Sequence, residues 1–167
     1  MSPVDENKLQ DLVGKVLVDL GGAASVPLAR LGRKHGLYRN LHVSGPATAN
    51  ELADRLGLAA RYVREWLCAQ AASGYVQFDP KTGRFSLSPE QVMVFVDEDS
   101  PVHLLPAFET AWCMAENFDK VSAAFESGQG VAWGDQPSNL FRAVARFFRP
   151  GYVNNLIDEW IPSLAGM

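Results

Sequence analysis

The stretch that most constrains the fold runs from residue 47 to residue 87, "ATANELADRLGLAARYVREWLCAQAASGYVQFDPKTGRFSL". Thr48 and Glu51 are spaced as a capping box, in which each side chain pairs with a free backbone N–H of the first helical turn. The helix that they begin should end at Gly57, and a second helix should run from about Ala60 to Ser73. Two short aromatic strands, joined by the turn "DPKTG", complete the pattern.

Helix, short turn, helix and hairpin, in this order, form the plan of a winged helix-turn-helix domain, whose hairpin is the wing. The sequence therefore predicts a mostly α fold with a small β-wing. We expect this domain at residues 8–95 and a helical cap after it at residues 96–167.

Apolar side chains recur at helical spacing outside this core. The pattern predicts helices over residues 6–20, 22–35, 104–127, 138–149 and 151–161. Gly36 should end the second of these helices, and Pro150-Gly151 should separate the last two. The segment after Pro89 reads as a short apolar stretch that ends in an acidic cluster.

The composition, 47% hydrophobic and 20% charged, is typical of a soluble globular protein. The N-terminus does not read as a signal peptide, and no window reads as apolar for 18 residues, so we expect no membrane span. Cys68 and Cys113 suggest no disulfide framework, which fits a cytoplasmic protein.

His35, His42 and His103 share no ligand spacing and read as surface or locally bonded groups, so no metal site is expected.

The net charge of −4 conceals an asymmetry along the chain. The first 84 residues carry 11 Lys or Arg against 8 Asp or Glu, and the rest carry 4 against 11. This mildly basic first half allows contact with nucleic acid, but dedicated binders concentrate much more positive charge. The candidates for contacting DNA are Arg61, Arg64, Lys81 and Arg84. Because Trp66 and several alanines make their helix apolar, packing on protein suits it better, and we expect no nucleic-acid partner.

Aromatic residues are numerous in the second half, where core packing and the wall of an apolar ligand pocket are both open interpretations. The candidates for binding a substrate are Trp112, Trp133 and Tyr152. The glycines of "GQGVAWG" follow a helix rather than a strand, so they indicate a connector and not a cofactor loop. No residue can be assigned a catalytic role from the sequence.

Two charged features have plain interpretations. The acidic run of residues 97–99 reads as a solvated loop. Arg142, Arg146 and Arg149 share one helix face, which could meet a phosphate or an acidic partner, although a solvated face is the simpler interpretation.

Residues 47–90 resemble the N-terminal winged-helix region of a family of bacterial S-adenosylmethionine-dependent methyltransferases. The resemblance is carried by "ELA", "RYVREWL", "GYV" and the wing turn "YDPxTGxYxL", in which Phe78 and Phe85 stand where the family has tyrosine. Around this core the resemblance extends over residues 20–95, and it covers the later helices more loosely.

The resemblance implies an accessory domain for dimerisation and substrate enclosure, followed by helices that roof the active site of a Rossmann-like methyltransferase domain. The acidic-x-Gly-x-Gly loop that meets the cofactor in that family is absent from these 167 residues. We therefore expect the N-terminal part of a longer methyltransferase or a truncated relative, inactive and without cofactor on its own. The parent enzyme would transfer a methyl group from S-adenosylmethionine to a small hydrophobic acceptor.

Two sets of apolar side chains should lack cover in the chain alone. The leucine and valine stripe of residues 6–20 is our candidate for a homodimer contact. The last two helices should expose Phe141, Val144, Phe148, Leu156, Ile157, Trp160 and Ile161, which require a missing domain or another chain. The alternative function is a winged-helix transcriptional regulator in which residues 96–167 sense a ligand.

Overall fold

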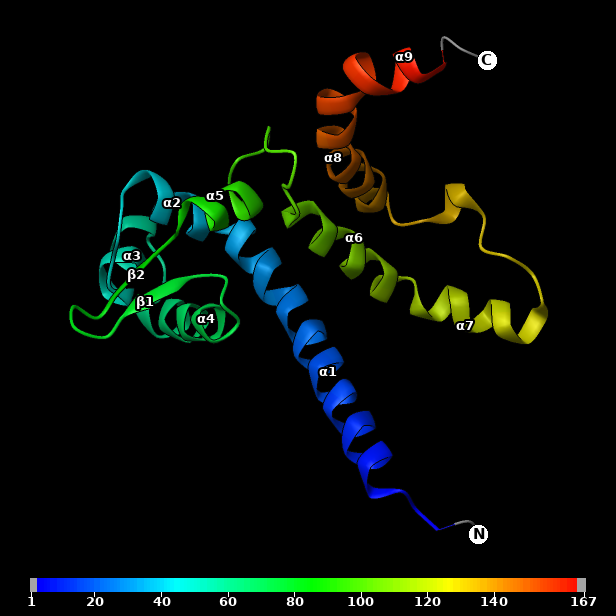
Figure 1. Cartoon of the computed structure of the whole chain (residues 1–167), viewed down its shortest axis with the longest axis horizontal. Helices are drawn as coiled ribbons and strands as arrows, with labels where there is room; N and C mark the ends of the chain where they lie inside the picture. The colour runs from blue at the N-terminus through cyan, green and yellow to red at the C-terminus, as the bar shows by residue number, and fades with distance from the viewer. Residues whose placement is uncertain (1–2, 165–167) are drawn as a thin grey trace.

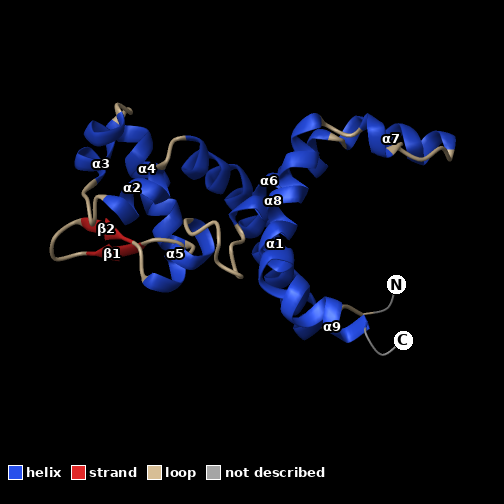
Figure 2. Ribbon diagram, turned by 90° about the horizontal axis from the view of Figure 1, so that it is seen from above, coloured by secondary structure: helices blue, strands red, loops and turns tan. Residues whose placement is uncertain are grey.

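The computed structural model describes residues 3–164 and divides them into a winged helix-turn-helix body and a second group of helices (Figures 1 and 2). The body contains α1 (Glu6–Lys34), α2 (Leu37–Val43), α3 (Ala49–Leu56), α4 (Ala60–Ala72), β1 (Gln77–Asp79), β2 (Arg84–Ser86) and α5 (Pro89–Phe95). The second group contains α6 (Leu105–Glu116), α7 (Phe118–Ser127), the 3-10 turn η1 (Trp133–Asp135), α8 (Ser138–Asn155), the π-helical η2 (Leu156–Trp160) and α9 (Ile161–Leu164). The predicted fold class, mostly α with a two-stranded wing, is confirmed.

The expected capping box begins α3. The backbone N–H of Glu51 donates to the Thr48 hydroxyl at 3.3 Å, and the N–H of Thr48 donates to the Glu51 carboxylate at 2.8 Å. The helix ends at Gly57, which takes the left-handed conformation (φ 64°) that glycine adopts without strain. The wing pairs Phe78 with Phe85 across β1 and β2, and Phe85 also bridges to Ala47, which fastens the wing to the start of α3.

An aromatic cluster joins the winged helix to the end of α1. Tyr38 stacks on Phe95 and meets Trp66 edge-on, with both pairs of ring centroids 4.9 Å apart. The indole N–H of Trp66 donates to the backbone carbonyl of Leu28 at 2.8 Å. Because these rings are buried and one also holds the α1 backbone, α1 is rigidly attached to the winged helix.

The prediction of two helices over residues 6–20 and 22–35 is wrong, because α1 is continuous. Gly21 and Gly22 each cost only about 1 kcal/mol relative to alanine within a helix. Pro27 removes one backbone hydrogen bond, but its segment packs against α4 and α6. This tertiary support keeps the last turns helical, while the first part of α1 projects away from the body (Figure 1).

Two segments that the sequence left without a helix are helical. Gly36 ends α1 as expected, but the chain turns at once into α2. The stretch after Pro89 forms α5, which begins with a second capping box between Ser88 and Gln91. Both helices are short, and they contribute Tyr38 and Phe95 to the core. Burial of these two side chains stabilises the helices.

The division of the second group of helices also differs from the prediction. The long helix expected over residues 104–127 breaks at the buried Asn117, whose side chain contacts Gln136. The expected break at Pro150-Gly151 is absent, and α8 continues through the buried Pro150. Helix α8 packs against α6, which compensates for the hydrogen bond that the proline cannot make.

The expectation that no segment is apolar enough to cross a membrane is corrected by α1. By length and composition alone, this helix could span a bilayer, since it contains an apolar window of 18 residues. Only 11% of that window is buried, and Lys15 and Asp19 form an ion pair within it. One such helix near an N-terminus is weak grounds for a membrane span, because core helices and signal sequences have the same composition.

Candidate functional site

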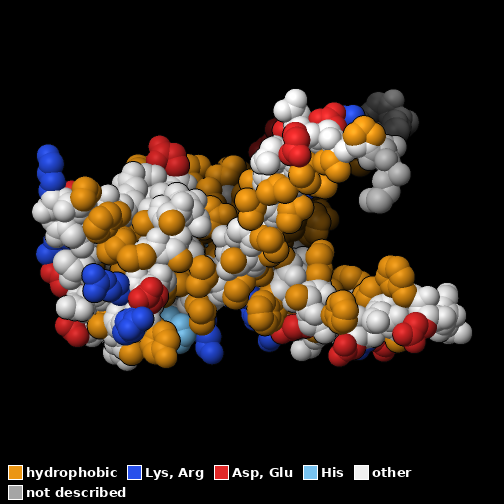
Figure 3. Space-filling view, turned by 90° about the horizontal axis from the view of Figure 1, so that it is seen from below, with side chains coloured by type: hydrophobic (Ala, Val, Ile, Leu, Met, Phe, Trp, Pro, Cys, Tyr) orange, Lys and Arg blue, Asp and Glu red, His pale blue; other side chains and the backbone are white. Residues whose placement is uncertain are grey.

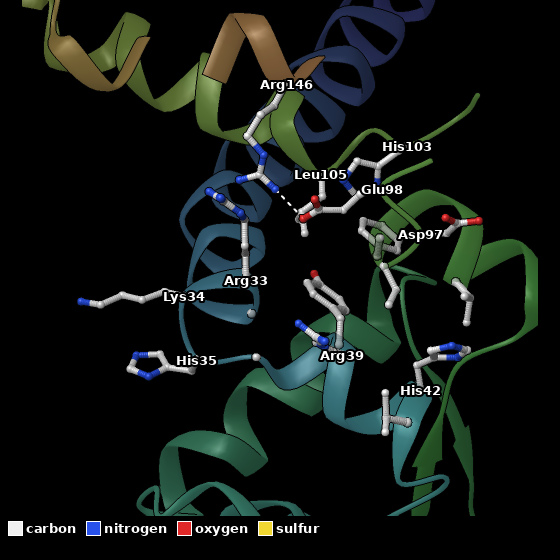
Figure 4. A pocket seen from close by; sticks show the side chains of 17 residues that line it. Arg33, Lys34, His35, Arg39, His42, Asp97, Glu98, His103, Leu105 and Arg146 are labelled. Atoms are coloured by element: carbon white, nitrogen blue, oxygen red, sulfur yellow. Dashed lines mark hydrogen bonds and ion pairs between the residues drawn. The ribbon is translucent and has the colours of Figure 1, made fainter. Parts of the chain in front are cut away.

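A large cavity lies where the end of α1 meets α2, α5, the start of α6 and α8 (Figure 4). Its volume is about 1060 Å³, at the upper end of the range for small-molecule sites. Part of its wall is apolar, formed by Tyr38, Phe95 and Leu105.

Basic side chains from three helices line this cavity. Arg33 comes from α1, Arg39 from α2 and Arg146 from α8. Arg146 pairs with Glu98 at 2.7 Å, and Arg33 pairs with Glu109 at 3.3 Å. Among the residues that the structure describes, no carboxylate pairs with Arg39 within salt-bridge distance.

His103 borders the same cavity and is almost fully buried, with only 4% of its surface exposed. Neither ring nitrogen has the distance and angle of a well-formed hydrogen bond within residues 3–164, although the Val94 backbone lies near enough to raise the pKa of the ring. The expectation of a surface position is therefore wrong for this residue. His35 and His42 line the same cavity, but no group of three metal-binding side chains forms among the described residues.

Ion pairs join the acidic run of residues 97–99 to the arginine stripe of α8. Glu98 binds Arg146, and Asp99 binds Arg149 at 2.8 Å. The loop of residues 97–99 is exposed to solvent as expected, and two of its carboxylates also form ion pairs with α8. The pairs fix the loop between α5 and α6 against α8 and close one side of the cavity.

Burial of His103 determines the sign of a pH effect. Desolvation lowers the pKa of the imidazole below its ordinary value of 6.5. Glu98, Asp97 and the Val94 backbone oppose this shift, and Arg33 adds to it. As the pH falls through about 6.5, the unfolded chain binds a proton that the folded chain does not, so the free energy of unfolding should decrease. We expect His103→Gln to lose less stability than the wild type between about pH 7.5 and about pH 5.5 in urea titrations.

The control for this experiment is His35→Gln, which removes an exposed imidazole from the rim of the cavity. The same loss of stability in the wild type and in His103→Gln would contradict the prediction.

The three predicted substrate-binding aromatics do not line one common cavity. Trp112 borders a separate cavity of about 650 Å³ between α1 and α6. The Arg30 guanidinium lies 4.6 Å from its ring centroid, and its indole N–H donates to Glu116 at 2.6 Å. Trp133 is 62% exposed and meets Phe141 edge-on, while Tyr152 is 54% exposed and meets Trp160. Their role as an acceptor wall remains a prediction.

Two of the four candidate DNA contacts are engaged within the chain. Arg61 pairs with Glu65 at 2.9 Å on the same helix. Arg84 pairs with Glu51 at 2.6 Å and donates to the Pro46 carbonyl at 2.9 Å. Arg64 is exposed on α4 and Lys81 is exposed in the wing turn. Arg84 therefore fastens the wing to α3, where its guanidinium has a structural role.

A broad apolar surface covers the helices after α6, and we call it the C-terminal apolar face. Figure 3 shows hydrophobic side chains along the arm that α7 forms. On α7, no residue is buried, and the face includes Phe118, Val121 and Phe125. On α8, η2 and α9 it includes Phe141, Phe148, Tyr152, Val153, Leu156, Ile157, Trp160, Ile161 and Leu164. Of the seven residues expected to be exposed here, only Val144 is half-buried.

A second apolar surface follows the projecting part of α1, and we call it the α1 stripe. It consists of Leu9, Leu12, Val13, Val16, Leu17 and Leu20, all more than 40% exposed. With about 3.6 residues per turn, these side chains lie roughly opposite Ser25, Ala29 and Gly32, which α1 buries against its own chain. The stripe therefore faces away from the described core.

Sequence reasoning missed the cavity of Arg33, Arg39, His103 and Arg146, because these residues are distant in sequence and match no motif. The sequence did contain a signal for one part of this cavity. The arginine stripe was recognised as a possible site for an anion, but its position beside α1 and α2 depends on how α8 packs.

Comparison with known proteins places these features in a wider context. Residues 23–96 match the Rv2258c-like winged HTH domain. No curated protein matches the chain. Three solved structures share its fold at 17–20% sequence identity.

The first of these structures, described as PigF with SAH, superposes with a TM-score of 0.61 and 18% identity over 86% of this chain. The Mitomycin 7-O-methyltransferase MmcR gives 0.65 and 17% over 89%, and LaPhzM gives 0.56 and 20% over 84%. The chain spans only 44%, 47% and 43% of the lengths of these three proteins, respectively. The chain thus carries an Rv2258c-like winged helix-turn-helix domain, and its fold is that of the N-terminal region of O-methyltransferases such as MmcR.

Proposed function

We propose that the chain is the dimerisation and substrate-capping part of an S-adenosylmethionine-dependent methyltransferase that acts on a small hydrophobic acceptor. The C-terminal apolar face is the observation that carries this proposal. It lies on the helices that follow the winged helix, where the resemblance implies a methyltransferase domain. The shared fold with MmcR supports the same reaction class.

The extent of the face argues for a protein partner. Phe125 is 88% exposed and Ile157 is 74% exposed, and both lie among other uncovered aromatic or aliphatic side chains. Burying one such side chain contributes about 1.5–3 kcal/mol. Contiguous apolar patches of this kind mark interaction surfaces in soluble proteins. A methyltransferase domain that covers α7 and α8 would remove these side chains from water.

The α1 stripe supports a homodimer. A helix that projects from its domain with six large aliphatic residues along one side is unstable alone, and a second copy can cover the stripe symmetrically. The partner we propose here is therefore a second copy of the same chain.

The chemistry would be an in-line displacement at the sulfonium methyl group, with S-adenosylmethionine held by the methyltransferase domain. The chain itself would align the acceptor and exclude water from it. Trp112, Trp133 and Tyr152 are our candidates for contacting the acceptor, and we assign no catalytic residue. The two cysteines are free, which suits a reducing cytoplasm, where we propose the protein acts.

The decisive experiment begins with the reading frame that encodes the chain and the frames beside it. One of them should encode a buried strand followed by an acidic-x-Gly-x-Gly loop. A protein that contains both parts should bind S-adenosylmethionine in calorimetry and transfer its labelled methyl group to a small aromatic or aliphatic acceptor. Residues 1–167 alone should bind no cofactor. Tight operator binding by this chain, lost on substitution of Arg61 and Arg64 with alanine, would instead favour a transcriptional regulator.

A further inference from the structure

We propose that the cavity between α1, α2, α5 and α8 binds a compact oxyanion, the phosphate or carboxylate group of a small molecule. This inference does not depend on the proposed methyltransferase function, because every residue that carries it lies within the chain. Figure 4 shows side chains from these helices around the cavity, with Arg146 reaching down to Glu98.

The charge of the lining favours an anion. Arg33, Lys34, Arg39 and Arg146 outnumber the two acidic residues of the lining, Asp97 and Glu98. A guanidinium group offers several N–H donors in a planar fork that matches the oxygens of a phosphate or carboxylate. Three such groups from three different helices border one hollow.

Arg39 and Arg146 can be made available to a ligand at low cost. Arg39 has no ion-pair partner among the residues described. Arg146 pairs with Glu98, whose side chain is 69% exposed and lies in the loop between α5 and α6. A pair this exposed contributes about 1 kcal/mol or less, so a ligand oxyanion can displace the Glu98 carboxylate from Arg146.

His103 is the second and independent observation. Its ring lines the cavity with no well-formed hydrogen bond to either nitrogen, although only 4% of the residue is exposed and the Val94 backbone lies nearby. An unpaired buried polar group is costly, and most such groups in native proteins have a partner. A neutral imidazole donates one N–H, and an oxyanion held by the neighbouring arginines would accept it.

The shape of the site restricts the ligand to a small molecule. The cavity is a half-open hollow lined by five helices and the loop between α5 and α6, and its wall includes the rings of Tyr38 and Phe95. A phosphate or carboxylate with a small apolar body would satisfy the basic groups and cover this wall. Lys34 and His35 lie at the rim and extend outward in Figure 4, so they can attract the anion without contacting it in the bound state.

Titration of the purified chain tests the proposal. The probes are inorganic phosphate, acetate and benzoate, followed by calorimetry and by the ring nitrogen signals of His103 in ¹⁵N NMR. We expect saturable binding of at least one probe, with the His103 signals shifting at the same dissociation constant. Phosphate binding alone identifies a phosphate ligand, whereas binding of acetate or benzoate alone identifies a carboxylate ligand.

Three variants make the test specific to the cavity. Arg39→Gln removes the unpaired guanidinium and should weaken binding about tenfold. Glu98→Gln removes the competing carboxylate and should tighten binding severalfold. Arg64→Gln is the matched control, because it removes the same charge from an exposed position on α4 and should leave the affinity unchanged.

All three positions are largely exposed, so the variants should keep the wild-type melting temperature in circular dichroism, which checks the fold. Unsaturable binding of every probe would overturn the proposal. So would equal weakening by Arg39→Gln and Arg64→Gln, which would show a general effect of net charge.

Discussion

Replacing Leu12 and Val16 together with aspartate should convert a dimer of this chain into a monomer. Both side chains lie in the middle of the α1 stripe, one turn apart, with Leu12 59% exposed and Val16 46% exposed in the single chain. Each would contribute about 1.5–3 kcal/mol when a second copy covers it, and the two copies carry four such side chains in all. Two aspartates per copy would also place like charges in contact. The dissociation constant should rise more than a hundredfold.

Sedimentation velocity or light scattering at several protein concentrations measures this change. The matched control is Gly14→Asp with Val18→Asp, which introduces the same charges at the same spacing on the opposite side of α1. Both control positions are exposed, and a Cβ at Gly14 would meet no atom within 4 Å. The control should remain a dimer. If the wild type is monomeric, or if both double variants dissociate equally, the α1 stripe is not the dimer contact.

Gly32→Ala should destabilise the fold, whereas Gly22→Ala in the same helix should stabilise it. A Cβ at Gly32 would lie 2.4 Å from the ring of Tyr38 and 2.5 Å from the ring of Trp66. Both rings are buried in the aromatic cluster, so neither can move without disturbing the other. Overpacking of this kind costs about 1–3 kcal/mol, which exceeds the gain of about 1 kcal/mol in helix propensity.

At Gly22 the added methyl group would meet no atom within 4 Å, so only the gain of roughly 0.5–1 kcal/mol remains. Urea denaturation of both variants at one fixed protein concentration measures the two changes in the free energy of unfolding. The opposite signs are the essential result. If Gly32→Ala proved as stable as Gly22→Ala, the close approach of α1 to the Tyr38–Trp66 pair would be incorrect.

The winged helix could be predicted because its signals are local. The capping box of Thr48 and Glu51, the helix ends at Gly57 and Gly74, and the turn "DPKTG" each act within a few residues. Such signals depend on backbone geometry and nearby side chains, which the sequence specifies directly. The helix boundaries that failed, at Gly21-Gly22 and at Pro150, involve local penalties of about 1 kcal/mol for each glycine and about 3 kcal/mol for the proline. Packing of α1 on α4 and α6, and of α8 on α6, outweighs these penalties.

The cavity around His103 could not be predicted, because it requires α1, α2, α5 and α8 to meet. Arg33, Arg39 and Arg146 have no common spacing in the sequence, and only the fold gathers them. The same limit applied to Trp112, Trp133 and Tyr152, which were grouped by residue type. The structure separates them, since Trp112 lies beside Arg30 and the other two lie on the C-terminal apolar face.

By itself, the sequence determined which side chains share a face, because helical periodicity follows from the order of residues alone. It thereby established the leucine and valine stripe of α1 and the aromatic residues of the last helices. Only the tertiary structure decided which faces the chain covers with its own core. Helix α1 buries Ser25, Ala29 and Gly32 in its second part and leaves the stripe uncovered, because its described residues before Ser25 project from the body and are exposed on every side.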